Sequence, residues 1–132
     1  MATESRHLSV SIDRPAGEVY DYAADPRHLP EWAAGLAGGI HLDAGEWVAD
    51  SPMGRVVVRF VPRNELGVLD HDVTLPSGTT VRNPLRVLPD GEGCEIVFTL
   101  RRQPAMTDAE FAADAAAVTA DLATLKRLVE SR

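Results

Sequence analysis

The sequence predicts an α+β fold in which one curved antiparallel sheet of seven strands packs against a long C-terminal helix. Near the C-terminus, apolar residues recur at spacings of three and four, which places them on one face of a helix: Phe111, Ala115, Val118, Leu122, Leu125 and Val129. The chain before this helix consists mainly of short alternating segments bounded by turn residues, as in β-strands. The helix must bury its apolar face, so we expect it to lie across the sheet.

The first strand and two short helices are expected before residue 35. Apolar and polar side chains alternate over residues 7–13, as in a half-buried strand. Pro15 suits the first position of a helix. Asp25 and Pro26 repeat this start signal, but Pro30 prevents a regular helix, so one or two loosely joined turns are expected up to Ala34.

Six further strands are expected between residues 40 and 101. Their runs of alternating or β-branched residues lie at 40–42, 47–51, 55–61, 68–75, 80–88 and 94–101. The C-terminal helix then begins at a capping box, because Thr107 and Glu110 can each satisfy a backbone N–H of the other.

Side-chain parity predicts which residues share the inner face of the sheet. A slip of one residue would turn every apolar side chain of a strand to solvent, so the hairpin loops must have matching lengths. On this basis the expected cross-strand pairs are Val73 with Asn83, His71 with Leu85, Val58 with His71, Phe60 with Leu69, Val87 with Ile96 and Leu85 with Phe98.

His71 and Asn83 are two polar exceptions on this otherwise aliphatic face. They are expected as diagonal neighbours roughly 7 to 8 Å apart, close enough to touch one bound molecule. A buried polar group without a partner costs about 1–3 kcal/mol, so each needs a hydrogen bond from protein, water or ligand. The alternative is structural: His71 is a satisfied core histidine, and Asn83 marks a bulge before Pro84.

Three aromatic residues with a polar atom are candidates for the mouth of a cavity, although such residues also complete cores: Tyr22, Trp32 and Trp47. With the inward-facing positions, the complete set of expected ligand contacts is Tyr22, Trp32, Trp47, Val58, Phe60, His71, Val73, Asn83, Leu85, Phe98, Val118 and Leu122. Cys94 has acidic neighbours that would not stabilise a thiolate, so a cysteine nucleophile is not expected.

Composition argues against several classes of function. The formal net charge is −7, whereas nucleic acids and anionic membranes attract clusters of lysine and arginine. One cysteine and four scattered histidines predict neither an internal disulfide nor a metal site. No apolar run approaches the roughly 20 residues of a membrane span, and the polar segment Met1 to Arg6 lacks the apolar core of a signal peptide. We therefore expect a cytoplasmic protein without a cofactor.

Two segments carry a resemblance to a known superfamily. The first runs from Val10 to Trp32 and contains Val19-Tyr20-Asp21-Tyr22 and Asp25-Pro26-Arg27-His28-Leu29-Pro30-Glu31-Trp32; the second runs from Asp121 to Glu130. They resemble the START-like superfamily, which includes bacterial polyketide cyclase/dehydrase proteins, lipid-transfer domains and the birch pollen allergen. The resemblance implies a single helix-grip domain over residues 1–132, with a seven-stranded sheet wrapped around the last helix, two short helices after the first strand, and a deep hydrophobic pocket.

Three hypotheses of function follow. The leading one is that the chain binds a small hydrophobic molecule, such as a lipid, an aromatic or a polyketide-like compound, between the sheet and the C-terminal helix. The second is a polyketide cyclase or dehydratase that uses His71 as acid and base and Asn83 to hold a carbonyl or enolate oxygen. The third is a protein interaction module with a filled cavity. Edge strands and apolar strand faces would also support a homodimer.

Overall fold

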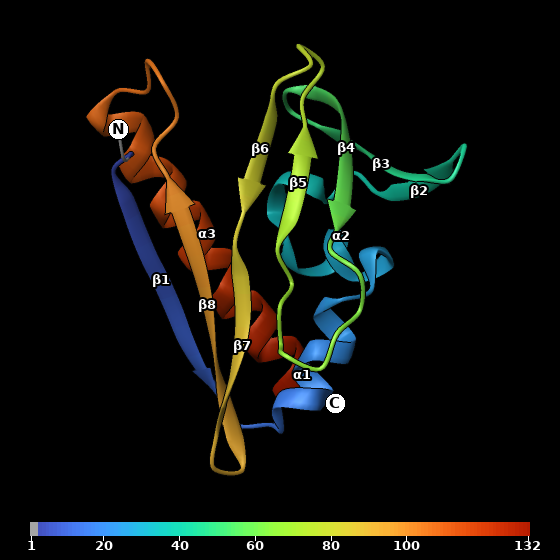
Figure 1. The fold of residues 1–132 in the computed structure, drawn as a ribbon, viewed down its shortest axis with the longest axis vertical. Helices are drawn as coiled ribbons and strands as arrows, with labels where there is room; N and C mark the ends of the chain where they lie inside the picture. Colours follow the sequence, from blue (N-terminus) through green and yellow to red (C-terminus); the bar gives the residue numbers. More distant parts are fainter. Residues whose placement is uncertain (1–2) are drawn as a thin grey trace.

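The computed structural model describes residues 3–132, which form eight strands in two antiparallel sheets with a long helix behind them (Figure 1). The strands are β1 (Ser5–Ile12), β2 (Ile40–Asp43), β3 (Glu46–Ser51), β4 (Gly54–Phe60), β5 (His71–Thr74), β6 (Thr80–Asn83), β7 (Leu85–Asp90) and β8 (Gly93–Arg101). One sheet has the order β1-β8-β7, and the other has the order β2-β3-β4-β5-β6. The expectation of one seven-stranded sheet is therefore wrong in detail.

Short helices connect β1 to β2, as predicted. They are α1 (Ala16–Ala23), the 3₁₀ turn η1 (Pro26–His28), α2 (Leu29–Trp32) and the 3₁₀ turn η2 (Ala34–Leu36). Pro15 is the residue that precedes α1. The Asp25 side chain accepts a hydrogen bond from the backbone N–H of Arg27 at 3.0 Å, which caps η1.

The C-terminal helix α3 (Asp108–Glu130) begins at the predicted capping box. The Glu110 N–H donates to Thr107 Oγ1, and the Thr107 N–H donates to the Glu110 carboxylate. The predicted stripe is buried except at Val118, which is only partly covered. The helix packs most closely against β1 and α2, so it covers the three-stranded sheet better than the five-stranded one.

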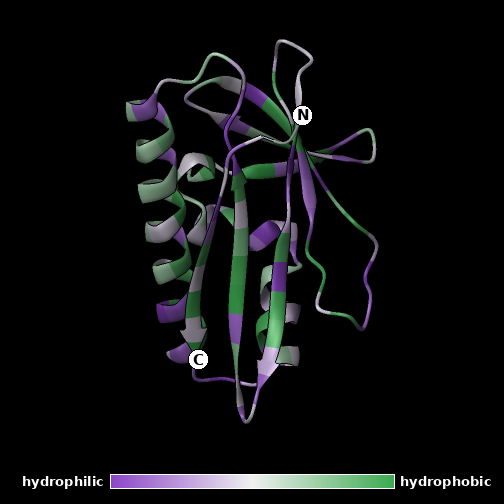
Figure 2. Ribbon diagram, turned by 60° about the vertical axis from the view of Figure 1, so that its left-hand side comes forward, coloured by the Kyte–Doolittle hydropathy of each residue, from purple (hydrophilic) through white to green (hydrophobic). Residues whose placement is uncertain are grey.

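The three-stranded sheet has the predicted register. Leu85 lies opposite Phe98 and Val87 opposite Ile96. Gly91 begins the two-residue hairpin loop with a φ of 58°, a conformation that glycine adopts without strain. Figure 2 shows β8 in the middle of this sheet as a largely hydrophobic strand, with α3 beside it. The two surfaces therefore share one apolar core.

In the five-stranded sheet the predicted registers are wrong by two residues, although every side chain keeps its predicted face. Val73 lies opposite Val81, and His71 lies opposite both Phe60 and Asn83. At the tip of the β5–β6 hairpin, Gly78 takes a φ of 91°, as the last residue of a three-residue loop requires. The loop therefore lies one residue earlier in the chain than the predicted pairing of Val73 with Asn83 implies. Because side chains alternate with period two, this shift leaves the inner face unchanged.

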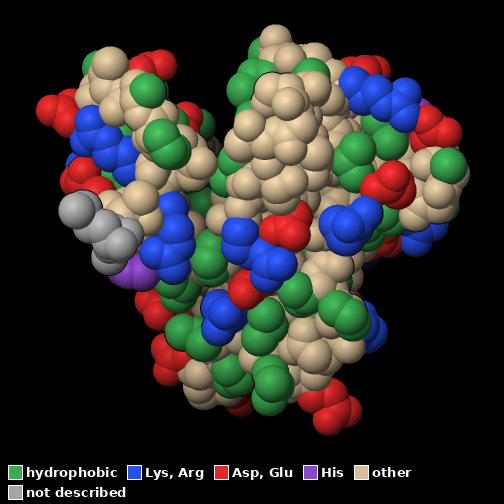
Figure 3. All heavy atoms as spheres, turned by 45° about the horizontal axis from the view of Figure 1, so that its top comes forward, with side chains coloured by type: hydrophobic (Ala, Val, Ile, Leu, Met, Phe, Trp, Pro, Cys, Tyr) green, Lys and Arg blue, Asp and Glu red, His purple; other side chains and the backbone are tan. Residues whose placement is uncertain are grey.

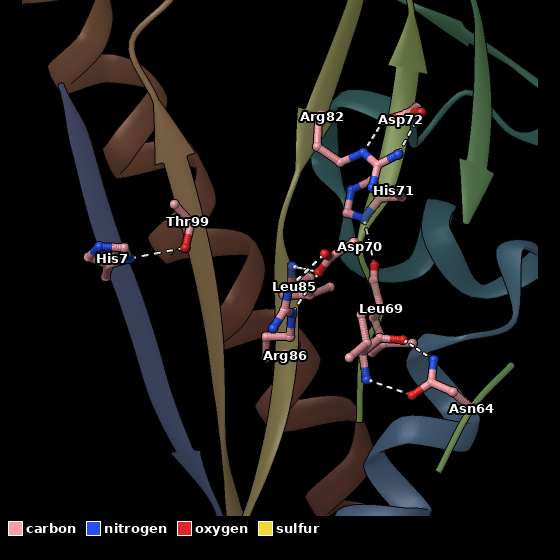
Figure 4. A network of polar contacts seen from close by, with 11 residues as sticks. His7, Asn64, Leu69, Asp70, His71, Asp72, Arg82, Leu85, Arg86 and Thr99 are labelled. Atoms are coloured by element: carbon pink, nitrogen blue, oxygen red, sulfur yellow. Dashed lines mark hydrogen bonds and ion pairs between the residues drawn. The ribbon is translucent and has the colours of Figure 1, made fainter. Parts of the chain in front are cut away.

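The expected strand over residues 80–88 breaks at Pro84, which divides it into β6 and β7. Proline has no N–H to donate to a neighbouring strand. At this point the Asp70 carboxylate replaces the backbone as partner: it accepts the Leu85 N–H at 2.9 Å and two hydrogen bonds from the Arg86 guanidinium at 2.9 and 2.8 Å (Figure 4). The predicted continuous strand over residues 80–88 is therefore wrong, and in place of a bulge at Asn83 the structure has a break at Pro84.

The two sheets join on one side of this break and diverge on the other. On the β7 side of the break, the Leu69 N–H donates to the Leu85 carbonyl and the Val87 N–H to the Gly67 carbonyl, both at 2.8 Å. A Cβ at Gly67 would lie 2.2 Å from the Val87 carbonyl oxygen, so only glycine allows this approach. Above the break, β6 and β8 separate after a hydrogen bond of 2.9 Å from the Thr99 N–H to the Pro84 carbonyl.

Asp70→Asn tests whether this carboxylate holds the junction together. The substitution keeps the side-chain shape but removes the charge that pairs with Arg86. We expect the free energy of unfolding at pH 7 to fall by about 2 kcal/mol, since hydrogen bonds to charged groups contribute ~1.5–3 kcal/mol. Urea unfolding followed by circular dichroism measures the change.

Asp72→Asn is the matched control, because its ion pair with Arg82 is more exposed and should contribute less than about 1 kcal/mol. The Arg86 hydrogen bonds hold the pKa of Asp70 below its ordinary value. The stability that Asp70 adds is therefore present in full above the unfolded-state pKa and is lost as the pH falls through the folded-state pKa. Equal losses in the two variants would contradict this role of Asp70.

Candidate functional site

The inner face of the five-stranded sheet gathers six of the predicted ligand contacts in two adjacent rows. One row crosses β3, β4 and β5 through Trp47, Val58 and Val73; the next crosses β4, β5 and β6 through Phe60, His71 and Asn83. Each residue of a row lies directly opposite the next, so their side chains are immediate neighbours. His71 and Asn83 are thus closer than the diagonal arrangement that the sequence predicted.

The His71 imidazole is buried and fixed in position. Its Nδ1 lies 3.0 Å from the Leu69 carbonyl oxygen, and its ring stacks on Phe60 with centroids 4.9 Å apart. The Phe98 ring approaches from the other sheet edge-on, at 6.3 Å. With 7% of its surface exposed, His71 is one of the two polar residues of the described core. In Figure 4 its neighbours Asp70 and Asp72 turn away toward Arg86 and Arg82, as strand parity predicts.

This environment selects one tautomer of His71. A carbonyl oxygen only accepts hydrogen bonds, so Nδ1 carries the proton and Nε2 presents its lone pair. Burial lowers the pKa of His71 below its ordinary value, and the Leu69 carbonyl and the Asp70 charge oppose this effect without reversing it. Nε2 has no hydrogen-bond partner within residues 3–132, and it is not fully enclosed by protein. His71 is therefore a neutral hydrogen-bond acceptor with a free position.

The apolar face around His71 is covered at one end and partly open at the other. Below the break at Pro84, Leu85, Val87 and Ile96 are at most 1% exposed. In the β5–β6 hairpin above it, Val73 and Val81 are only half-buried. Figure 3 shows a hollow on this side, between the β5–β6 hairpin and the segment that joins β8 to α3. The opening thus lies where the two sheets diverge.

The remaining predicted contacts lie on the other walls of the same core. Leu85 and Phe98 face one another across β7 and β8. From α3, Leu122 is 2% exposed, whereas Val118 is partly exposed one turn nearer the open end. A separate cavity of about 220 Å³ lies at the end of the Trp47 row, where Trp47, Val58 and Phe60 meet Pro26 of η1. Phe60 contacts this cavity and also stacks on His71.

The structure does not bring Tyr22 to this site. Its ring stacks on His28 with centroids 4.1 Å apart and lines a different cavity of about 250 Å³, with Val129 and Arg132 near the end of α3. Trp32 lies at the end of α2 and is 5% exposed. Its Nε1 is the one fully buried side-chain nitrogen or oxygen atom without a hydrogen-bond partner in the described chain.

Asp121 of α3 is a residue near the site that sequence reasoning missed. Its carboxylate accepts the Ala34 N–H at 3.2 Å, and burial raises the pKa of Asp121 above its ordinary value. The sequence does carry a signal, since Asp121 lies three residues after Val118 and four before Leu125, at the edge of the apolar stripe.

Other chemistry has little support in the described part of the chain. Burial raises the pKa of the Cys94 thiol, which disfavours the thiolate that a nucleophile requires. Within residues 3–132, no three side chains of His, Cys, Asp or Glu type are placed to hold a metal ion. None of the helices described is both long enough and apolar enough to span a bilayer.

Comparison with known proteins agrees with this architecture. The family model for polyketide cyclase / dehydrase and lipid transport matches residues 5–130. The chain belongs to this family. Among curated protein sequences, none is significantly similar to it.

Solved structures show the same helix-grip fold at low sequence identity. A conserved protein from Geobacillus kaustophilus has a TM-score of 0.78 at 12% identity, with 97% of this chain and 96% of that chain covered. An uncharacterized protein from Bacillus thuringiensis has a TM-score of 0.75 at 13% identity, with 96% and 99% covered. Truncated norcoclaurine synthase from Thalictrum flavum has a TM-score of 0.69 at 14% identity, with 99% and 96% covered. The predicted fold class is confirmed, with Pro84 accounting for the additional strand.

The His71 environment predicts a specific pH dependence of stability. Because its folded-state pKa is lowered, the unfolded chain takes up the proton first as the pH falls. The contribution of neutral His71 is therefore intact above the unfolded-state pKa of about 6.5 and declines below it until the folded-state pKa is reached. Between pH 7.5 and 5.5 we expect the wild type to lose about 1 kcal/mol more than His71→Gln, by urea unfolding at each pH. The other three histidines are common to both proteins, so parallel pH profiles would contradict the assignment.

Proposed function

We propose that this protein binds a small, largely apolar molecule between the inner face of β4–β6 and α3, with a ligand hydroxyl donating a hydrogen bond to His71 Nε2. The observation that carries the proposal is the fixed tautomer of His71. Its Nδ1–H is used by the Leu69 carbonyl, and its Nε2 lone pair is free within an aromatic and aliphatic wall. A ligand donor would supply the missing partner.

Family membership supports the proposal at the level of chemical class. Polyketides and lipids, which the family description names, are both largely apolar molecules with few polar atoms. A site of half-buried aliphatic residues with one directed acceptor matches that chemistry. The partial exposure of Val73, Val81 and Val118 argues against an interior filled by side chains, which the interaction-module hypothesis requires.

Two further parts of the proposal concern the setting of the protein. We place it in the cytoplasm, because the sole cysteine, Cys94, is buried and free, as suits a reducing compartment. A homodimer is a second arrangement that the exposed apolar side chains of Leu42, Met53 and Leu66 would support. Size-exclusion chromatography with light scattering measures the oligomeric state.

Val118→Phe tests the location of the site. The larger ring extends from the half-buried position on α3 into the proposed ligand space, so we expect binding of 2-naphthol to weaken at least tenfold. Isothermal titration calorimetry of the pure protein measures the affinity. Thr119→Phe is the matched control, since Thr119 is exposed on the same helix and should leave binding unchanged. Unchanged binding to Val118→Phe would refute the site.

A second arm of the experiment tests the polar contact. Wild type should prefer 2-naphthol to naphthalene, and His71→Gln should reduce that preference by about tenfold, which corresponds to one hydrogen bond of ~1.4 kcal/mol. A preference that survives in His71→Gln would exclude His71 as the acceptor.

The same geometry favours one catalytic function as a second candidate, an aldol-type cyclisation. A neutral imidazole with a free Nε2 is the form that accepts a proton. His71 would take a proton from the carbon next to a ligand ketone, and the C–H electron pair would form the enolate. The enolate carbon would attack a second carbonyl of the same chain, and the imidazolium would return its proton to the new alkoxide. Asn83, directly opposite His71, would donate to the enolate oxygen.

Deuterium exchange separates this enzyme from a binding protein. In D₂O, wild type should accelerate incorporation of deuterium into the methyl group of 2-acetylnaphthalene, as followed by NMR. His71→Gln should show only the buffer rate while remaining folded. Exchange at the buffer rate in the wild type, under conditions where the ketone is bound, would remove the catalytic candidate and leave the binding function intact.

A further inference from the structure

The outer edge of β1 is a long sheet edge without the usual protection against pairing. β1 is the first strand in the order β1-β8-β7, so only one of its two edges is paired (Figure 1). Its register with β8 runs from Ser5 to Ile12 without a bulge, and the strand contains neither proline nor lysine. Bulges, prolines and lysines are devices that keep an edge from pairing with another chain. The outer strands of the other sheet, β2 and β6, have only four residues each, and Pro84 follows β6.

Three residues of β1 direct free backbone groups to this open edge. The Arg102 N–H donates to the Glu4 carbonyl, so the even-numbered residues of β1 face β8 and the odd-numbered residues face away from it. At one end of the edge α3 supplies a partner, because Lys126 Nζ donates to the Ser11 carbonyl at 2.7 Å. Along the rest of the edge, no hydrogen bond within residues 3–132 reaches the outward-facing backbone N–H and C=O groups of Ser5, His7 and Ser9.

We propose that β1 forms the interface of a homodimer, in which it pairs antiparallel with β1 of a second copy across a two-fold axis at His7. This inference rests on the homodimer proposed above and locates its interface at β1, not at the exposed apolar side chains. It is independent of ligand binding.

The free backbone groups select one register for this pairing. With the axis at His7, each His7 lies opposite the other, and Ser5 of each copy lies opposite Ser9 of the next, which forms about six backbone hydrogen bonds. A shift of two residues in one direction would place Arg6 opposite Arg6, and like charges directly opposite are destabilising. A shift in the other direction would require the Ser11 carbonyl, which Lys126 already occupies.

The flank of α3 beside this edge is suited to the approach of a second copy. α3 follows β1 in the same direction, since the Arg6 guanidinium lies 5.6 Å from the centre of the Phe111 ring and Lys126 reaches Ser11. Antiparallel pairing of β1 would therefore make the two α3 helices antiparallel, with the acidic first turn of one toward the basic last turn of the other. On the Lys126 side of the helix, small exposed side chains allow close packing: Ala112, Ala116 and Ala123.

His7→Cys tests the register by covalent cross-linking. Residues that exchange both backbone hydrogen bonds in an antiparallel pair have Cα atoms about 5.5 Å apart, which is within the range of a disulfide. The sole natural cysteine, Cys94, is buried, so oxidised glutathione should convert most of His7→Cys to a covalent dimer on a non-reducing gel. Ser11→Cys is the matched control on the same strand. The proposed register separates the two copies of residue 11 by eight residues, roughly 27 Å, so this variant should stay monomeric on the gel.

Ser9→Pro tests the edge itself. The Ser9 N–H points away from β8, so proline removes a hydrogen bond of the dimer without removing one from the sheet of the monomer. We expect the dissociation constant of the dimer to rise at least tenfold, as measured by light scattering over a dilution series. Leu42→Lys is the control at the other outer strand, because it removes an exposed apolar side chain of β2, and it should leave the dimer unchanged.

The possible failures are distinguishable, and the cross-linking result decides the matter if Ser9→Pro does not fold. A dimer that forms no cross-link in His7→Cys, or that is lost in Leu42→Lys and kept in Ser9→Pro, would overturn the β1 interface while the homodimer stands. A wild type that remains monomeric at its highest soluble concentration would remove both. Neither result affects ligand binding, which calorimetry measures separately.

Discussion

The hydrogen-bonded pair of Asp70 and Arg86 is the interaction on which the architecture depends. Pro84 interrupts the strand between β6 and β7, where it cannot donate a backbone hydrogen bond. The Asp70 carboxylate takes the adjacent Leu85 N–H and the Arg86 guanidinium instead. The two sheets are consequently held together on one side of Pro84 and are free to diverge on the other. The open end of the candidate site is a consequence of that asymmetry.

The same junction controls the chemistry of His71, the next residue along the chain. Since adjacent residues of a strand point to opposite faces, the requirement that Asp70 faces Arg86 turns His71 inward. The carboxylates of Asp70 and Asp72 are occupied by arginines on the outer face, so they do not orient the imidazole. Among residues 3–132 its only hydrogen bond is to the Leu69 carbonyl, which leaves a neutral ring with Nε2 available. Consecutive residues thus place a structural ion pair on one face of the strand and the proposed ligand acceptor on the other.

Predictions from sequence succeeded where they depended on periodicity and failed where they depended on loop geometry. The α3 stripe, the capping box at Thr107 and the inward face of His71 follow from repeat periods of 3.6 and two residues, which are local properties of the chain. The registers around β5 were wrong by two because Gly78 and the Asn64 side chain set the loops. Asn64 binds the backbone at Leu66 and Val68, and parity arguments do not contain that information.

The sequence by itself determined the α+β class, the order of elements and the residues that face inward, because each follows from side-chain spacing and turn chemistry within a short stretch of chain. Only the tertiary structure decided that Asn83 lies beside His71, that the Trp32 indole N–H has no acceptor in the described part of the chain, and that Tyr22 belongs to another surface. These facts depend on contacts between residues far apart in the chain. Such contacts depend on how a proline break, a partly buried ion pair and a helix fit together in space, and a local sequence pattern does not contain that information.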